Sequence, residues 1–339
     1  MQFSFQDTNE QLKSCLIIGG GISGLVAGTL LQHRGIKVTI LDKGRGIGGR
    51  LATRRINFPP YGEGVFDYGA QFFSVSHPQF QVWVDGWLKQ GIVGEWSKQF
   101  SKTGKTCYRG IESNCSIAKY LAKDLTVHTQ TRVVKVKYED SHWVVEAEDK
   151  TNFSGEVLII TSPVPQALAL LDSANVSLPT QVRQGLEKVT YGPCIAILAL
   201  LEQPSSIPEP GGLLLNDPSL QWLACNQKKG ISPQGNAVTL HSTPEFSTIH
   251  WDLADSLIAE KLFTIAAPWL GSKVVKYQVH RWSYSQPKTF YGKPYAAIQK
   301  PGTLVMAGDC FSESKVKEPS LNLEKAALSG IEAANYLLS

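Results

Sequence analysis

The sequence has no long apolar run, because no window approaches the roughly 18 uninterrupted apolar residues that a membrane helix needs. The short apolar run at residues 15–18 does not resemble the core of a signal peptide. Charge of one sign is also lacking: 33 basic residues face 29 acidic ones, and the basic residues form no stripe that would bind nucleic acid. These absences favour a cytoplasmic protein with a small-molecule substrate, and neither a membrane nor a nucleic acid as partner.

Metal and disulfide patterns are missing as well. The six cysteines include no Cys-x-x-Cys pair and no spacing with histidine that suits a metal ion. We therefore expect reduced thiols and no metal site, as is usual in a cytoplasmic protein. No serine or cysteine stands in a pattern that predicts a nucleophilic triad.

The chain is long enough for about two domains, since it has 339 residues and an ordinary globular composition. Residues 15–71, 126–162 and 302–339 contain short buried strands and helical repeats that predict one discontinuous dinucleotide-binding domain. Residues 72–125 and 163–301 hold most of the tryptophans and prolines, and we expect them to form a substrate domain.

A glycine-rich turn follows the first predicted strand, Leu16–Ile18, and has the form G-x-G-x-x-G. In this motif Gly19 makes the tight turn, Gly21 lets the backbone approach a pyrophosphate, and Gly24 lets the following helix touch the strand. The helix N-terminus offers unpaired N–H groups to phosphate oxygens. The predicted phosphate site also includes Ile22 and Ser23.

Two features downstream limit which nucleotide can bind. Asp42 ends the second strand, where a carboxylate accepts hydrogen bonds from ribose hydroxyls and repels a 2′-phosphate. A second glycine-rich loop, residues 43–50, ends in Arg50, whose guanidinium has the shape to bind a diphosphate from another side. A nicotinamide dehydrogenase does not need this second loop, so the pair of loops favours FAD; we add to its site Lys43, Gly49 and Leu51.

Later segments are predicted to surround the flavin ring. Gly69 and Ala70 interrupt an aromatic run, which is typical of backbone that passes close to a flat ring. Gly308-Asp309 precedes a final helix over about 320–338, whose first N–H groups would stabilise negative charge on a reduced flavin. The remaining residues of the predicted cofactor site are Gln71, Val133, Val134, Thr161, Asn322 and Leu323.

The set GGGISG, LDKGRGIGGR, FDYGAQFF and GDCF resembles the motifs of the FAD-dependent amine-oxidase superfamily. Within that superfamily the chain is most similar to the renalase-like enzymes. Three segments carry this narrower resemblance: residues 107–110 (CYRG), 241–247 (HSTPEFS) and 280–284 (HRWSY). From these segments we take His241, Arg109 and Arg281 as candidate catalytic residues.

The resemblance implies an α/β fold: a Rossmann-like FAD-binding domain with three layers (β-β-α) and a mixed-sheet substrate domain of the hydroxybenzoate-hydroxylase type. It implies non-covalent FAD that accepts a hydride from a dihydronicotinamide, such as an isomer of the dinucleotide NAD(P)H. Molecular oxygen would then reoxidise the flavin and yield hydrogen peroxide. Such a transfer releases no proton, so no strong base is required, and none stands out in the sequence.

Two alternatives remain open at this point. An amine oxidase or a carotenoid-type desaturase would share the FAD loops but needs an amine cage or a long apolar tunnel. A non-enzymatic flavoprotein, such as a redox sensor, is suggested by two departures from the superfamily pattern, Cys310 and the helix entry at residues 319–324. We expect Cys310 to be a small packed residue, not a covalent flavin link.

Overall fold

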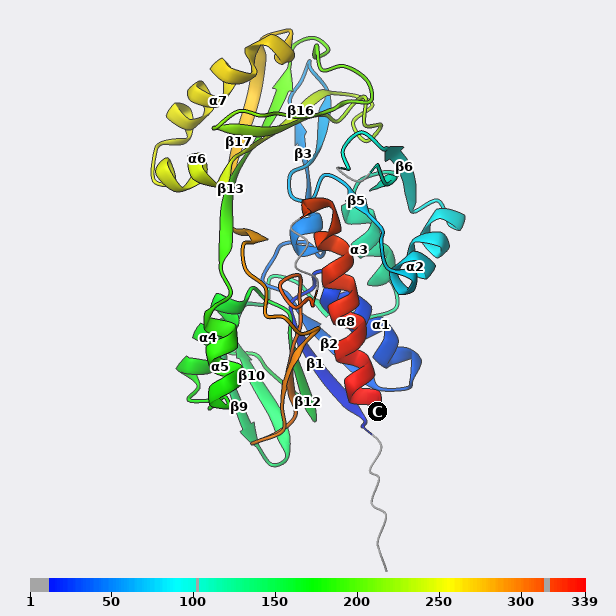
Figure 1. The fold of residues 1–339 in the computed structure, drawn as a ribbon, viewed down its shortest axis with the longest axis vertical. Coiled ribbons are helices and arrows are strands. Elements are labelled where there is room, and N and C mark those ends of the chain that lie inside the picture. The colour runs from blue at the N-terminus through cyan, green and yellow to red at the C-terminus, as the bar shows by residue number, and fades with distance from the viewer. Residues whose placement is uncertain (1–11, 102–103, 314–317) are drawn as a thin grey trace, which may run out of the picture.

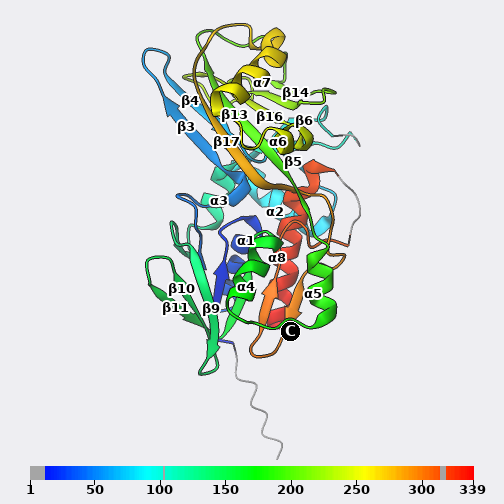
Figure 2. The same cartoon turned by 90° about the vertical axis from the view of Figure 1, so that its left-hand side faces the viewer.

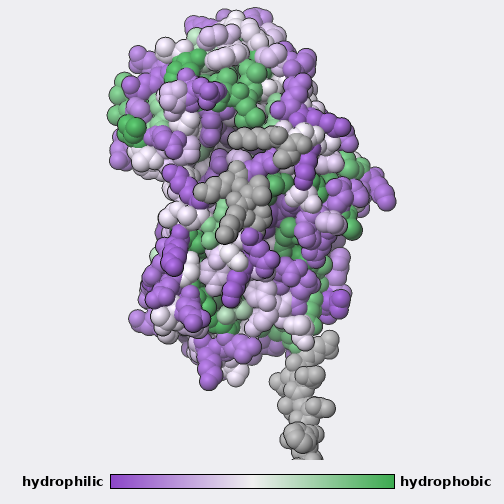
Figure 3. Space-filling view, viewed as in Figure 1, coloured by the Kyte–Doolittle hydropathy of each residue, from purple (hydrophilic) through white to green (hydrophobic). Residues whose placement is uncertain are grey.

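The computed structural model describes residues 12–101, 104–313 and 318–339. Two lobes stand one above the other in Figure 1 and meet at a narrow waist, which Figure 3 shows as a notch on one side of the molecule. We call them the parallel-sheet lobe, which contains both termini of the described chain, and the antiparallel-sheet lobe. No helix among the described residues is long and apolar enough to cross a membrane.

The parallel-sheet lobe is built on a six-stranded sheet. Its strand order is β18-β19-β12-β1-β2-β8, and every neighbouring pair is parallel except β18 and β19. The bounds of the strands, in chain order, are β1 Ser14–Ile18, β2 Lys37–Leu41, β8 Thr126–His128, β12 Val157–Ile160, β18 Ala296–Ile298 and β19 Leu304–Met306.

Both faces of this sheet are covered, and therefore its central strands β12 and β19 are apolar and buried throughout. Ile17 and Ile159 face α1 (Ile22–His33) and α8 (Asn322–Leu338), whereas their neighbours Leu16 and Leu158 face the opposite side. That side is covered by a three-stranded antiparallel sheet of β9 (Val133–Glu139), β10 (His142–Ala147) and β11 (Asn152–Gly155). The lobe is thus a β-β-α sandwich, as predicted.

The antiparallel-sheet lobe is built on a five-stranded sheet, in the order β14-β15-β16-β13-β17. Helices α6 (Pro244–Ile249) and α7 (Asp255–Leu270) cover one face, and the hairpin of β3 (Thr53–Asn57) and β4 (Glu63–Asp67) packs against the other (Figure 2). The strand bounds are β13 Tyr191–Leu201, β14 Gly212–Leu214, β15 Leu220–Cys225, β16 Asn236–Ser242 and β17 Val274–Pro287.

The packing divides the chain differently from the predicted boundaries. Helices α2 (Pro78–Lys89) and α3 (Cys115–Leu121) share the core of α1 and α8, although the sequence placed residues 72–125 in the substrate domain. Helices α4 (Val164–Ser173) and α5 (Thr180–Glu187) likewise pack beside β9 and β10. Their apolar faces pack on elements that are distant in sequence, which local patterns do not reveal. Beside α2 and α3 lies a small sheet of β5 (Phe73–Ser74), β6 (Val93–Ser97) and β7 (Cys107–Gly110).

Two strands, and not one, occupy residues 126–139: β8 ends at His128 and belongs to the parallel sheet, whereas β9 begins at Val133 in another sheet. Gln130, with φ of 54°, turns the chain between them. The last helix begins at Asn322, after a single 3₁₀ turn over Pro319–Leu321. A similar turn, Gly49–Leu51, ends the second glycine loop.

Candidate flavin and substrate site

The N-terminus of α1 borders a long groove of about 1300 Å³ between the lobes. A Cβ at Gly24 would lie 2.1 Å from the carbonyl oxygen of Gly19, so only glycine lets the helix start this close to β1. Gly21 has open space where a side chain would be, and no side chain caps the helix. Buried Ser23 Oγ has no hydrogen-bond partner within the described chain. A phosphate would satisfy these groups.

Asp42 joins the two glycine loops. Its carboxylate accepts from Gly20 N–H and from Gly44 N–H, both at 2.6 Å, and it borders the groove with lone pairs left for a ribose. Gly48 N–H also donates to Gly20 O at 2.7 Å. The loops that the sequence predicted to hold opposite sides of a diphosphate are therefore bound directly to each other.

Arg50 holds the last loop of the fold in place. Its guanidinium makes a bidentate pair with Asp309, at 2.5 Å from Nη1 and 2.9 Å from Nη2. The same group borders both the groove and a smaller cavity beyond it. The Arg50 guanidinium, which the sequence predicted to bind a diphosphate, thus pairs with a carboxylate 259 residues away in sequence. Arg50 and Asp309 mark the boundary between the two spaces.

Most of the predicted cofactor residues meet in the groove. The structure brings there Gly19, Gly21, Ile22, Ser23, Asp42, Lys43, Gly49, Arg50, Leu51, Val133, Val134, Thr161, Gly308, Asp309, Asn322 and Leu323. Gly24 lies behind its wall and acts through helix packing. Gly69, Ala70 and Gln71 border the smaller cavity instead.

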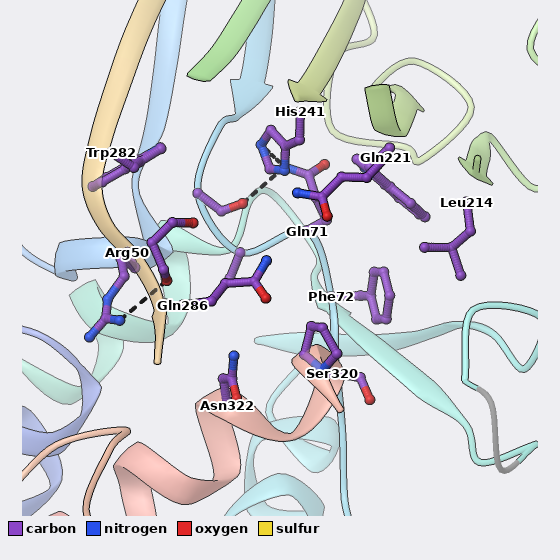
Figure 4. Close-up of a pocket in the computed structure, with 15 residues that line it drawn as sticks. Arg50, Gln71, Phe72, Leu214, Gln221, His241, Trp282, Gln286, Ser320 and Asn322 are labelled. Carbon is purple, nitrogen blue, oxygen red and sulfur yellow. Dashed lines mark hydrogen bonds between the residues drawn. The ribbon is translucent and has the colours of Figure 1, made fainter. Parts of the chain in front are cut away.

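The smaller space, which we call the inner cavity, has a volume of about 160 Å³ (Figure 4). Aromatic rings and uncharged amides dominate its wall, and they come from both lobes. In Figure 4 the amides of Gln221 and Gln286 point toward its centre, Asn322 rises from α8, and Phe72 and Leu214 close the opposite side. The other bordering residues are Arg50, Gly69, Ala70, Gln71, Trp222, His241, Trp282, Ser285, Pro319 and Ser320.

A buried lysine fixes the loop of residues 68–71 at this cavity. Lys229 Nζ donates to Asp67 Oδ2 at 2.6 Å and to Gln71 O at 2.7 Å, and both charged side chains are fully buried. Asn114 Nδ2 donates to Ala70 O at 2.6 Å from the other side. Only glycine fits at position 69, since a Cβ there would lie 2.1 Å from the backbone oxygen of Arg50.

His241 also serves this loop. Its Nε2 lies 3.0 Å from Tyr68 O, so Nε2 carries the proton and donates it to that carbonyl. Trp282 Nε1 donates to the same oxygen at 2.9 Å. Burial lowers the pKa of His241 to about 4, which keeps the ring neutral at physiological pH. The ring therefore orients backbone, and it is not placed as a strong base.

Neither predicted catalytic arginine reaches the inner cavity. Arg109 Nη1 donates to its neighbours Gly110 O and Ile111 O, at 3.0 and 2.9 Å, outside the residues that border the cavity. Arg281 borders the groove, but its guanidinium points to the region of α7, where it bonds Asp255 at 2.7 Å. Of the three candidates, the structure brings only His241 to the cavity.

Sequence reasoning missed several residues of the site. Lys229 stands in the polar run 226–230, which is typical of an exposed turn, so no local signal marked it. Trp222 lies in an apolar strand that has the pattern of ordinary core.

At Cys310 the structure agrees with a packed residue, because burial raises the pKa of its thiol to about 12 and keeps it protonated. Among the described residues no group of three or more side chains could hold a metal ion.

Two family models and a curated relative match this chain. The model of the flavin containing amine oxidoreductase family matches residues 100–338, and that of the NAD(P)-binding Rossmann-like domain matches residues 17–86. Renalase of Mus musculus is 24% identical over 330 residues, covering 88% of this chain and 93% of its own. Both the family and this relative favour an enzyme over a non-enzymatic flavoprotein.

Solved structures show the same fold. The A394C mutant of putrescine oxidase superposes with a TM-score of 0.71 at 15% identity, covering 96% of this chain and 99% of its own. Wild-type putrescine oxidase bound to putrescine gives 0.69 at 15% identity, covering 94% and 98%. Because one family model spans most of the chain, the protein belongs to the flavin-containing amine oxidoreductase family, and it is a flavin-dependent oxidoreductase.

Proposed function

We propose that the long groove holds FAD non-covalently, with the ADP half at Ser23 and Asp42 and the ring system near Arg50 and Asn322. The orphaned Ser23 hydroxyl, the open side of Gly21 and the uncapped start of α1 support this assignment. Bound flavin supplies the acceptor for a hydride. We also propose that the antiparallel sheet, with helices on one face, is a substrate domain of the hydroxybenzoate-hydroxylase type.

We further propose that the inner cavity binds a small reduced ring, a dihydronicotinamide, which gives up a hydride and becomes aromatic. The observation that carries this proposal is the character of the cavity wall. It combines aromatic rings with neutral amides, and among the described residues that border it no carboxylate occurs and Arg50 is the one charged side chain. Such a wall suits a flat uncharged ring.

The protein's own residues supply positioning in this reaction. Phe72 and Trp282 offer faces against which a ring can stack, while the amides of Gln221 and Gln286 can bond its substituents. The neutral His241 and the buried pair of Lys229 and Asp67 keep the loop of residues 68–71 rigid. No proton has to be removed from the substrate, which agrees with the lowered pKa of His241.

The cavity is less suitable for the substrates of an amine oxidase or a carotenoid-type desaturase. An alkylammonium ion would enter a site with no carboxylate on the described wall, and the charge of Arg50 at its border is already paired with Asp309, so no anion would compensate the ion for its lost hydration. Aromatic rings alone could still attract such a cation. A volume of about 160 Å³ has no room for a carotenoid chain. The family model permits each of these substrates, so the test must compare them directly.

Anaerobic mixing of the holoenzyme with a panel of reductants tests the proposal. We expect isomeric dihydronicotinamides to bleach the flavin absorbance faster than primary amines or diamines do, with hydrogen peroxide formed after oxygen is admitted. Faster bleaching by amines would reject the dihydronicotinamide assignment and favour the amine oxidase. Release of the yellow colour by acid or heat should show that the flavin is not covalently bound.

The rate constant of flavin reduction should be independent of pH between about 5.5 and 8. A free histidine titrates near 6.5, whereas burial lowers the pKa of both His241 and His280 to about 4, so both rings stay neutral across this range. Stopped-flow traces at saturating dihydronicotinamide would check this. An inflection near pH 6.5 that disappears in His241→Gln would instead identify His241 as an acid or base.

A further inference from the structure

Two buried polar atoms at the inner cavity have no hydrogen-bond partner within the described residues: Gln71 Oε1 and Trp222 Nε1. Both side chains are more than nine-tenths buried, at 6% and 4% exposure, and both border the cavity. Leaving such an atom unpaired costs about 1–3 kcal/mol, so a pair of them in one cavity indicates a ligand that completes their bonding.

The roles of the two atoms are fixed by their surroundings. Gln71 Nε2 donates to Asp67 O at 2.6 Å and to Gly69 O at 3.2 Å, which leaves Oε1 as an acceptor. Indole Nε1–H is a donor only. One atom therefore needs a donor from the ligand and the other needs an acceptor.

His241 connects the two side chains in space. Gln71 Nε2 lies 3.5 Å from His241 Nε2, and Trp222 is the cross-strand partner of His241 where β15 pairs with β16. Directly opposed residues of an antiparallel pair project from the same face of the sheet. The unpaired donor and the unpaired acceptor thus belong to one side of the cavity.

From this arrangement we infer that Gln71 and Trp222 form a recognition pair for a primary carboxamide on the substrate ring. A carboxamide offers a carbonyl to Trp222 Nε1–H and an N–H to Gln71 Oε1, so it satisfies both atoms without adding charge. A carboxylate has no donor for Gln71, and an ammonium ion has no acceptor for Trp222. This inference rests on the proposed function, since it names the group by which the enzyme distinguishes a dihydronicotinamide from other flat rings.

Three neutral, oxidised ring ligands isolate the two bonds in the holoenzyme. Nicotinamide carries both groups, 3-acetylpyridine replaces the NH₂ by a methyl group, and 3-ethylpyridine lacks the carbonyl as well. For the native protein, titration calorimetry should show nicotinamide binding about three- to tenfold more tightly than 3-acetylpyridine, which is the effect of one net hydrogen bond. Equal affinities, or no binding of nicotinamide at millimolar concentration, would overturn the role of Gln71.

Trp222→Phe tests the other bond, because it keeps an aromatic ring at this position and removes the donor. We expect it to weaken nicotinamide and 3-acetylpyridine by the same factor, about three- to tenfold, and to leave 3-ethylpyridine unchanged. The matched control is Trp96→Phe: its ring lies 6.0 Å from that of Trp222, but its Nε1–H already donates to Pro210 O at 2.9 Å. This control should change none of the three affinities.

The outcomes separate the inference from the proposed function. Equal weakening of all three ligands by Trp222→Phe, or a changed spectrum of the ligand-free flavin with unchanged affinities, would contradict the recognition pair. If dihydronicotinamides fail to reduce the flavin while the three ligands show the expected order of affinities, the proposed function is wrong and carboxamide recognition is still supported. The wild-type ligand series stays decisive even if Trp222→Phe folds poorly.

Discussion

Lys229→Met is expected to lower the free energy of unfolding by about 3–5 kcal/mol, because it leaves the Asp67 carboxylate buried without its cation. Both side chains have 0% exposure, and Nζ lies 2.6 Å from Oδ2. Methionine has a similar shape, so the decrease in the free energy of unfolding measures mainly the missing charge and not the missing volume. Urea unfolding at pH 7, with a fixed excess of FAD, would measure it.

Two controls define what the loss means. Lys150→Met removes an ion pair with Glu146 whose lysine side chain is 80% exposed, and it should change stability by less than about 0.5 kcal/mol. Adding Asp67→Asn to Lys229→Met should recover part of the loss, because the amide oxygen can still accept from Asn114 N–H while the buried charge is gone. A double variant no more stable than Lys229→Met would show that the electrostatic explanation is wrong.

Gly24→Ala is expected to weaken FAD binding by at least about 10- to 100-fold. Its Cβ would lie 2.1 Å from Gly19 O and 3.1 Å from both Ile17 Cγ2 and Thr161 Oγ1, so the start of α1 must move away from the glycine loop. Overpacking of this kind costs about 1–3 kcal/mol. The displaced N–H groups would no longer point at a phosphate. Flavin fluorescence during titration of the apoprotein gives the dissociation constant.

Gly28→Ala is the matched control for this prediction. It lies one turn further along the same helix, and the three nearest atoms to its Cβ would be side-chain methyl groups and not backbone, the closest being Ile40 Cδ1 at 3.1 Å. Alanine also favours the helix by up to about 1 kcal/mol over glycine. We expect native FAD affinity in this variant. Weak binding by both variants would mean that the helix as a whole, and not its contact with the loop, controls the cofactor.

The nucleotide end of the site could be predicted because it is local in the chain. Gly19, Gly21, Gly24 and Asp42 belong to one strand-turn-helix-strand unit, in which backbone geometry alone places each residue. The second strand ends at Leu41, directly before Asp42, as the sequence predicted. Every one of these assignments depends on contacts between neighbours along the chain.

The substrate end could not be predicted in the same way, as Arg281 and Trp282 show. They are adjacent on β17, so their side chains point to opposite faces of the sheet. Which face borders the inner cavity depends on where α7 packs, and α7 takes the side of Arg281. The sequence resemblance covered both residues, and it led us to take Arg281 as a candidate, whereas Trp282 is the one that borders the cavity.

The burial of Lys229 could not be predicted from the sequence either. A lysine in a polar turn is expected to lie in solvent, since burial of an unpaired ammonium is costly. Here its partner Asp67 is 162 residues away, and only the packing of the β3–β4 hairpin on the antiparallel sheet brings the two together. Arg50 and Asp309 are likewise brought together from opposite ends of the chain.

The sequence alone determined the glycine loops and the strand-turn-helix-strand unit that contains the first of them, because strand, turn and helix are encoded by residues within a few positions of each other. Tertiary structure decided the wall of the inner cavity. Gln71, Trp222, His241, Gln286 and Asn322 come from five separate segments, and strand register sets the direction of several of their side chains. That register follows from the packing of whole sheets and helices, which no local pattern contains.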